Sequence, residues 1–255
     1  MHFISLLSLN LRFFTDLKNK FYIYLFIFQP AIMLFIITTM LKIRSSYNAD
    51  KYIIAVGISV AIIYVVYSSG SSIVSEKWWG TIELLLGSNT SLFKIILSKT
   101  VSNAIIATMF FFISIAYAKF LFGYTLEIKS YLLFALSFLV LIISFIAIGS
   151  IIGLLSLVFK DVFTFHNILH LPLVILSGIF FPVDSFMLII KFLSFCLPSY
   201  WSVSALFNSI GNVDIYPFIF KILLSLTLTI LYLLITLFLT KKLENNILDN
   251  SKVGL

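Results

Sequence analysis

One charged, tryptophan-bearing stretch between two long apolar runs holds the densest polar chemistry of the chain, Ser75-Glu-Lys-Trp-Trp-Gly-Thr-Ile-Glu-Leu-Leu-Leu-Gly-Ser88. If residues 76–86 form a short helix that Ser75 caps, Glu76 lies in the first turn, where acidic residues are favoured. Glu83 follows seven residues later, close to the same helical face. The pattern predicts either a docking surface whose carboxylates pair with basic groups of a partner, or an ordinary polar loop with its tryptophans at the lipid headgroups. The residues alone leave both hypotheses open.

A second pair of candidate groups is His166 and His170, which are four residues apart and share one face of an expected helix. A zinc site needs at least three protein ligands, so hydrogen bonding to neighbouring spans is favoured over metal binding. The sequence holds no G-x-x-x-x-G-K-[ST] pattern and no evident nucleophile–base pair. We therefore expect no enzyme activity from this chain by itself, and no metal or other cofactor of its own.

The composition is that of an integral membrane protein. Of 255 residues, 61% are hydrophobic and 11% are charged, and the mean hydropathy is +1.14. The apolar runs are continuous rather than alternating, which favours helices over barrel strands. The net charge is +7, but Lys and Arg lie at the ends of apolar runs, where they anchor helices at anionic headgroups. We expect membrane lipids, and not nucleic acid, as partners.

The whole chain, 1–255, is expected to form a single all-α membrane domain. Residues 3–18 predict an amphipathic helix that lies in the membrane interface. Six transmembrane helices follow, expected at residues 21–41, 52–74, 97–118, 131–158, 163–181 and 218–240. With the N-terminus inside, ten Lys and Arg lie on the cytoplasmic side against seven outside, which favours cytoplasmic termini.

Residues 182–216 are too apolar for an exposed loop, yet Pro182, Pro198 and Gly211 break them too often for one straight span. We expect short re-entrant helices there, at 186–195 and 200–207, dipping into the outer leaflet. Within the fourth span, Gly149 and Gly153 form a G-x-x-x-G pattern that lets helices approach closely, either within the chain or in a dimer. No carboxylate lies deep in an expected span, which weighs against an ion-coupled carrier or a proton channel.

Two motifs resemble those of the ABC-2 family of transporter permeases. The first is Glu-Lys-Trp-Trp-Gly-Thr-Ile-Glu-Leu-Leu-Leu at 76–86, followed by Ser91 and Lys99. The second is Leu-Ser-Gly-Ile-Phe-Phe-Pro-Val at 176–183, with Leu-Pro at 197–198 and Ala-Leu at 205–206. The resemblance covers essentially the whole chain. It implies that the outer segment of the family includes Gly178, Phe181, Pro182 and Pro198 of this sequence.

In that family the cytoplasmic turn between spans two and three contacts the ATP-binding subunit. The resemblance implies this coupling role for residues 76–91, and within them for Glu76, Trp78, Gly80, Thr81, Glu83, Leu84 and Leu85. The two tryptophans stand where an arginine or a small residue is usual, and 87–90 replace a Thr-Pro-type segment, which leaves the docking geometry open. Only Gln29-Pro30 matches the tryptophan–acidic–proline pattern of polysaccharide-exporting members, so the resemblance is closer to the drug- and antibiotic-exporting branch.

The hypothesis that follows is the permease subunit of an ABC exporter in the plasma or inner membrane. Two permease copies, identical or related, are expected to work with two ATP-binding subunits, which bind the ATP and Mg²⁺. The many phenylalanines, 28 in all, favour an amphipathic drug-, lipid- or peptide-like cargo. The alternatives are a polysaccharide- or glycolipid-exporting ABC-2 permease and a non-ABC membrane carrier or channel.

Overall fold

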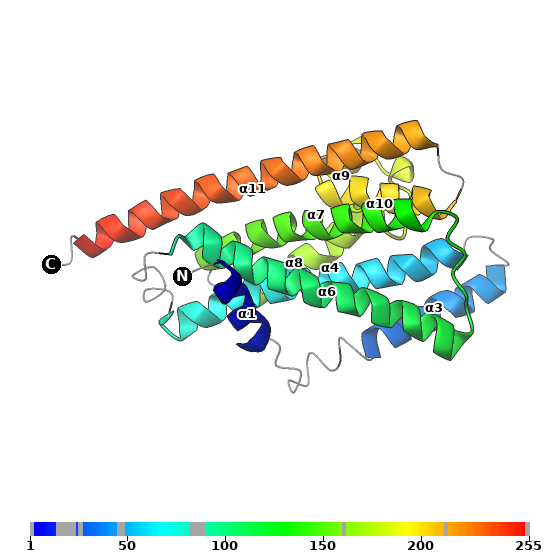
Figure 1. The fold of residues 1–255 in the computed structure, drawn as a ribbon, viewed down its shortest axis with the longest axis horizontal. Coiled ribbons are helices and arrows are strands. Elements are labelled where there is room, and N and C mark those ends of the chain that lie inside the picture. Colours follow the sequence, from blue (N-terminus) through cyan, green and yellow to red (C-terminus); the bar gives the residue numbers. More distant parts are fainter. Residues whose placement is uncertain are drawn as a thin grey trace.

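The computed structural model describes residues 3–13, 24, 28–44, 49–81, 90–159, 162–211 and 214–252, and within these ranges its regular structure is helical. The elements are α1 (Phe3–Phe13), α3 (Gln29–Arg44), α4 (Ala49–Trp78), α6 (Leu92–Phe122), α7 (Tyr131–Val158), α8 (Val162–Leu176), the short 3₁₀ helix η2 (Val183–Ser185), α9 (Leu188–Phe195), α10 (Pro198–Ile210) and α11 (Ile215–Lys252) (Figure 1). The predicted all-α class is confirmed for this part of the chain.

Four of the described helices, α4, α6, α7 and α11, are long and apolar enough to cross a membrane, which makes the chain a multi-pass membrane protein. The helices at the places of the expected first and fifth spans are shorter, with apolar stretches Gln29–Leu41 and Thr164–Leu176. Most of the first expected span before residue 28 lies outside the described residues. The count of six spans therefore stays a prediction.

Several helix ends differ from the expected boundaries, and glycine explains two of them. The third span was expected to end at residue 118, but α6 continues to Phe122, where Gly123 with φ +70° accepts the left-handed conformation and closes the helix. The fifth was expected to reach residue 181, but α8 ends at Leu176 because Gly178 has φ +67° and turns the chain.

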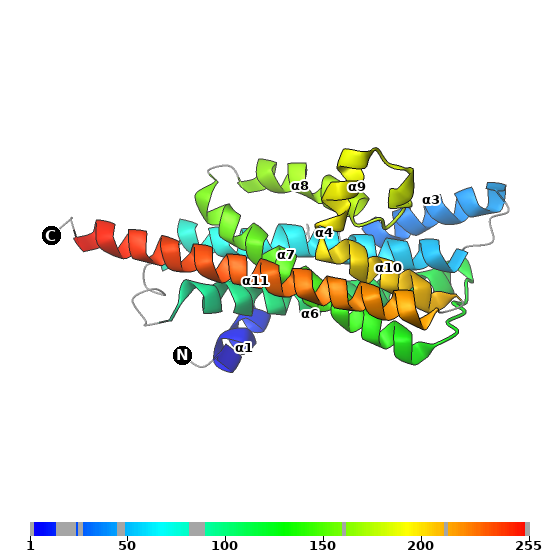
Figure 2. The ribbon, with the colours of Figure 1, turned by 90° about the horizontal axis from the view of Figure 1, so that it is seen from above.

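The helices form an elongated bundle with α4 at its centre. α4 packs against α3, α6, α7 and α8, whereas α11 lies at the periphery against α7, α10 and the edge of α6 (Figures 1 and 2). One continuous apolar core joins α4, α6 and α7 through residues such as Ile58, Phe110 and Phe145. The helix at the expected interfacial position, α1, packs on α6. Residues 14–18 of the expected helix are outside the described part, and the interfacial location stays a prediction.

Both chain termini lie at one end of the bundle, here called the N/C end (Figure 1). The same end carries α1, the last turn of α4, the first turn of α6 and the C-terminal part of α11 (Figures 1 and 2). The opposite end carries the connection from α6 to α7 and the start of α11. The end of α4 and the start of α6, which flank the expected coupling turn, therefore lie at the end that also holds both termini.

Candidate functional site

The candidate site is the end of α4 and the turn that follows it. α4 ends at Trp78, and Gly80, with φ +67°, supplies a backbone conformation that residues with side chains rarely adopt. Trp78 and Trp79 are 68% and 72% exposed. Glu83, Leu84 and Leu85, for which the resemblance implies coupling roles, lie outside the described residues.

The expectation that Ser75 caps a new helix at Glu76 is wrong. α4 runs without a break through both residues, and the Ser75 hydroxyl donates to the Ser72 carbonyl oxygen 3.0 Å away inside the helix. Glu76 therefore lies in the last turn of α4, where the helix dipole disfavours a negative charge. Its placement there needs a compensating cation.

Lys99 of α6 supplies that cation. Its Nζ donates to Glu76 Oε1 over 2.8 Å and to the Ser72 carbonyl oxygen over 3.0 Å, and the two side chains are only 3% and 15% exposed. The Thr81 hydroxyl donates to the same carboxylate from the far side of Gly80. A buried ion pair with further hydrogen bonds holds one geometry, because breaking it would leave an unpaired charge inside the protein.

This pair changes the role expected of Glu76. Its carboxylate is bound inside the chain and ties the end of α4 to α6, rather than being presented to a partner as the docking hypothesis assumed. Among the described residues beside it, the two indoles and Gly80 are exposed. The sequence did contain a signal for Lys99: it is a lysine inside the apolar stretch 92–122, where an ionisable residue needs a partner.

The first turns of α6 are held by two more helices at the N/C end. Asn10 Nδ2 of α1 donates to Ser98 Oγ over 3.0 Å. The backbone N–H of Leu92 donates to Glu244 Oε1 of α11 over 2.5 Å. Sequence reasoning missed Glu244, and it offers no local signal, because its partner is 152 residues away.

Gly149 and Gly153 of α7 face α4 of the same chain. A Cβ on Gly149 would lie 2.7 Å from Ser69 Oγ, and one on Gly153 would lie 2.5 Å from Ile73 Cδ1. The two glycines thus allow α4 and α7 to pack closely, which is the intrachain alternative of the two that the sequence left open.

The two histidines face different hydrogen-bond partners. His166 is fully buried, with Nε2 3.2 Å from Ser156 Oγ of α7. The Tyr67 hydroxyl of α4 donates to Asn167 Oδ1 and lies 3.3 Å from His170 Nδ1. Within the described ranges no group of three His, Cys, Asp or Glu side chains could hold a metal ion; Asp161 is outside them. The contacts that are present link α8 to α4 and α7.

The outer segment folds as two short helices after a turn. α9 and α10 meet at 87°, close to the two short helices expected from the sequence. Gly178 makes the turn after α8, Phe181 is 59% exposed, and Pro182 precedes η2. Pro198 begins α10, and its carbonyl oxygen accepts hydrogen bonds from the Ser202 and Ser225 hydroxyls.

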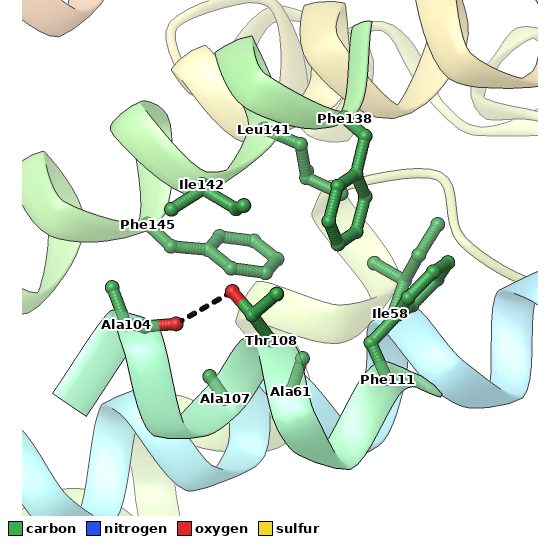
Figure 3. A pocket seen from close by; sticks show the side chains of 10 residues that line it. All are labelled: Ile58, Ala61, Ala104, Ala107, Thr108, Phe111, Phe138, Leu141, Ile142 and Phe145. Atoms are coloured by element: carbon green, nitrogen blue, oxygen red, sulfur yellow. Dashed lines mark hydrogen bonds between the residues drawn. The ribbon is translucent and has the colours of Figure 1, made fainter. Parts of the chain in front are cut away.

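A small apolar pocket lies between α4, α6 and α7 (Figure 3). Ile58, Phe111, Phe138 and Phe145 line it, and its one hydroxyl, on Thr108, donates to the Ala104 carbonyl oxygen over 2.9 Å. The pocket has a volume of about 10 Å³, room for about one water molecule. Drug-sized ligands fill roughly 300–1,000 Å³, so this pocket holds no such molecule.

The comparison with protein families assigns this architecture. The chain matches the family model described as ABC-2 type transporter over residues 6–210. A search of curated proteins finds no match. The family match removes the non-ABC carrier or channel from the alternatives. Because it covers most of the chain, including α4, the Glu76–Lys99 pair and the outer helices, the protein belongs to the ABC-2 type transporter family and is a membrane subunit of an ABC transporter, which works with an ATP-binding subunit.

Proposed function

We propose that the chain is the permease of an ABC exporter and that the turn after α4 receives the movement of the ATP-binding subunit. ATP binding would close the ATPase pair, and the turn would pass that motion to the spans. A ligand shifts an equilibrium only through different contacts with its states, so the turn must bind the open and closed ATPase differently. The chain itself would bind no nucleotide and catalyse no hydrolysis.

The observation that carries this proposal is the buried Glu76–Lys99 pair directly beside exposed indoles. A coupling element has to present a surface and be rigidly attached to the helices that it moves. Trp79 supplies an exposed aromatic group of the kind that anchors protein interfaces. The ion pair joins α4 to α6 next to it, and α4 contacts most of the bundle. A push on the turn would therefore reach α4 and α6 together.

The cargo path would run between two permease copies. The described pocket between α4, α6 and α7 is far too small for cargo and is not itself that path. We propose that the complex lies in the plasma or inner membrane. Both termini would be cytoplasmic, because the end of α4, where the ATP-binding subunit would dock, lies at the N/C end with them. For the cargo we propose an amphipathic drug-, lipid- or peptide-like molecule.

Co-purification tests the coupling role. The chain is isolated in mild detergent from cells that also produce its ATP-binding subunit, and the ratio of the two proteins is measured. We expect a stoichiometric complex, and we expect Glu83→Arg to lose most of the ATPase because a repulsive charge enters the docking surface. Glu127→Arg is the matched control: it reverses an exposed carboxylate between α6 and α7, at the opposite end of the bundle, and should leave the ratio unchanged.

Two results would overturn the proposal. If the wild-type chain brings no ATPase under conditions that preserve other membrane complexes, the coupling role is wrong. If Glu83→Arg retains the wild-type ratio, the turn is not the docking surface.

A separate experiment tests the cargo. Stimulation of ATP hydrolysis in lipid discs, by amphipathic compounds or by glycolipids, distinguishes the proposed cargo class from the polysaccharide or glycolipid alternative.

A further inference from the structure

The C-terminal helix α11 lies at the edge of the bundle along α7 and α10, and its C-terminal part extends beyond the other helices at the N/C end. Its apolar span covers Ile215–Asn245, and the helix continues to Lys252, past the ends of its neighbours (Figure 1). The family match ends at residue 210, so it assigns no role to α11. Near the end of the span, Leu243 and Glu244 contact elements that are distant in the sequence.

The side chain of Glu244, in α11, reaches the first residue of α6. The first N–H groups of any helix lack partners within the helix, and a carboxylate there is favoured by the helix dipole. The local cap of α6, Ser91, makes no side-chain capping bond in the described structure. Glu244 Oε1 instead accepts the hydrogen bond of the Leu92 N–H. Glu244 of the last helix thus satisfies the first N–H of α6, whereas a capping side chain at position 91 would accept from the second or third.

Leu243 adds an apolar contact in the same turn of α11. It packs against a small cluster made of Ile73, Leu92, Ile96 and Leu154, which come from α4, α6 and α7. This cluster is separate from the main core and lies beside the turn after α4. One turn of α11 therefore packs on a cluster to which α4, α6 and α7 all contribute.

We propose that Glu244 and Leu243 are positioning residues that tie the last span to the first turn of α6, so that movement of the turn after α4 also reaches α11. This inference rests on the proposed coupling function. The tie matters because α11 packs mainly against α7 and α10 and meets α6 only at its edge. Without it, α6 would move with the turn while α11 stayed behind.

Distance measurement between spin labels tests the tie directly. Lys94→Cys on α6 and Lys241→Cys on α11 are exposed labelling sites, and Cys196→Ser removes the chain's one native cysteine, which is exposed. The labelled chain is studied with its ATP-binding subunit in lipid discs, without nucleotide and with trapped ATP. We expect one narrow distance distribution that nucleotide leaves unchanged. In Glu244→Ala we expect a broader distribution whose mean shifts on ATP binding, whereas Asn245→Ala, an exposed neighbour, should behave as wild type.

A second variant separates a tie from a simple helix cap. Ser91→Asp in the Glu244→Ala background supplies a local N-cap, so it should restore the thermal stability of α6 but not the narrow distance. If Ser91→Asp also restores the narrow distance, or if Glu244→Ala never broadens it, the tie is wrong. If no ATPase binds, the coupling proposal fails separately, and the width of the distribution in the ATPase-free chain still decides whether the tie exists.

Discussion

α4 and α11 are both long apolar helices, yet they occupy opposite kinds of place. Their apolar windows have mean hydropathies of 2.1 and 2.6, but 94% of the α4 window is buried inside the protein, against 17% for α11. Hydropathy therefore identifies a membrane helix without telling where in the bundle it lies. Lipid tails are as apolar as leucine, so apolar side chains gain little by leaving lipid for the protein interior.

Packing, rather than hydropathy, makes the difference. α4 carries small residues that admit close neighbours: a Cβ on Gly57 would lie 2.8 Å from the Phe111 ring, and one on Gly70 would lie 1.8 Å from His166 Nε2. α11 instead presents large exposed side chains, among them Phe220, Leu234 and Phe238. Helices with small residues reach van der Waals contact along their length, and a helix covered in bulky residues remains at the edge.

The largest expected effect comes from the same truncation in both helices. Ile62 of α4 is fully buried and Ile230 of α11 is 57% exposed. Ile62→Ala leaves a cavity in a packed core and should lower the free energy of unfolding by about 2–5 kcal/mol. Ile230→Ala should cost less than about 1 kcal/mol, since lipid or detergent fills the space. Thermal or denaturant unfolding in detergent measures both, and equal losses would show that α4 is not the better packed helix.

The next effect comes from adding atoms instead of removing them. Gly70→Val forces side-chain carbon between α4 and the His166 ring, with Ser156 Oγ only 2.6 Å from the new Cβ. Overpacking of this kind costs about 1–3 kcal/mol. Thr227→Val at an exposed position of α11 introduces the same residue and should change stability by less than about 0.5 kcal/mol. If Gly70→Val is as stable as the wild type, α4 and α8 do not pack as closely as these distances indicate.

The sequence predicted much of the fold because the long apolar runs and the glycine and proline breaks are local signals. The fourth span was expected at 131–158 and is α7, Tyr131–Val158. The two short outer helices follow from Pro182 and Pro198. What failed was the local interpretation of Ser75 as a cap, because a helix end depends on what the next helix supplies. Lys99 makes the continuation through Glu76 possible, and it is 23 residues away.

The sequence singled out candidate residues but not their partners. The residue types drew attention to Glu76, Trp78 and Gly80, and the resemblance to ABC-2 permeases added Thr81 and the coupling role, which stays a prediction. The partners that decide what Glu76 does, and the Glu244 contact with α6, come from tertiary packing. A sequence carries no local record of a contact between residues 92 and 244, so such pairs are visible only in three dimensions.

The smallest predicted effect concerns a hydrogen bond that joins α11 to α10. Ser225, fully buried, donates to the Pro198 carbonyl oxygen over 3.0 Å, and Ser202 donates to the same oxygen over 3.2 Å. Because Ser202 keeps the acceptor occupied, Ser225→Ala should cost only about 0.6 kcal/mol, the average for hydrogen bonds between membrane helices. Ser202→Ala alone should cost a similar amount, and the double variant should cost more than the sum, because the oxygen then loses both hydroxyl donors. Unfolding of the four proteins gives the coupling energy. Strict additivity would mean that the two hydroxyls act independently on the Pro198 oxygen.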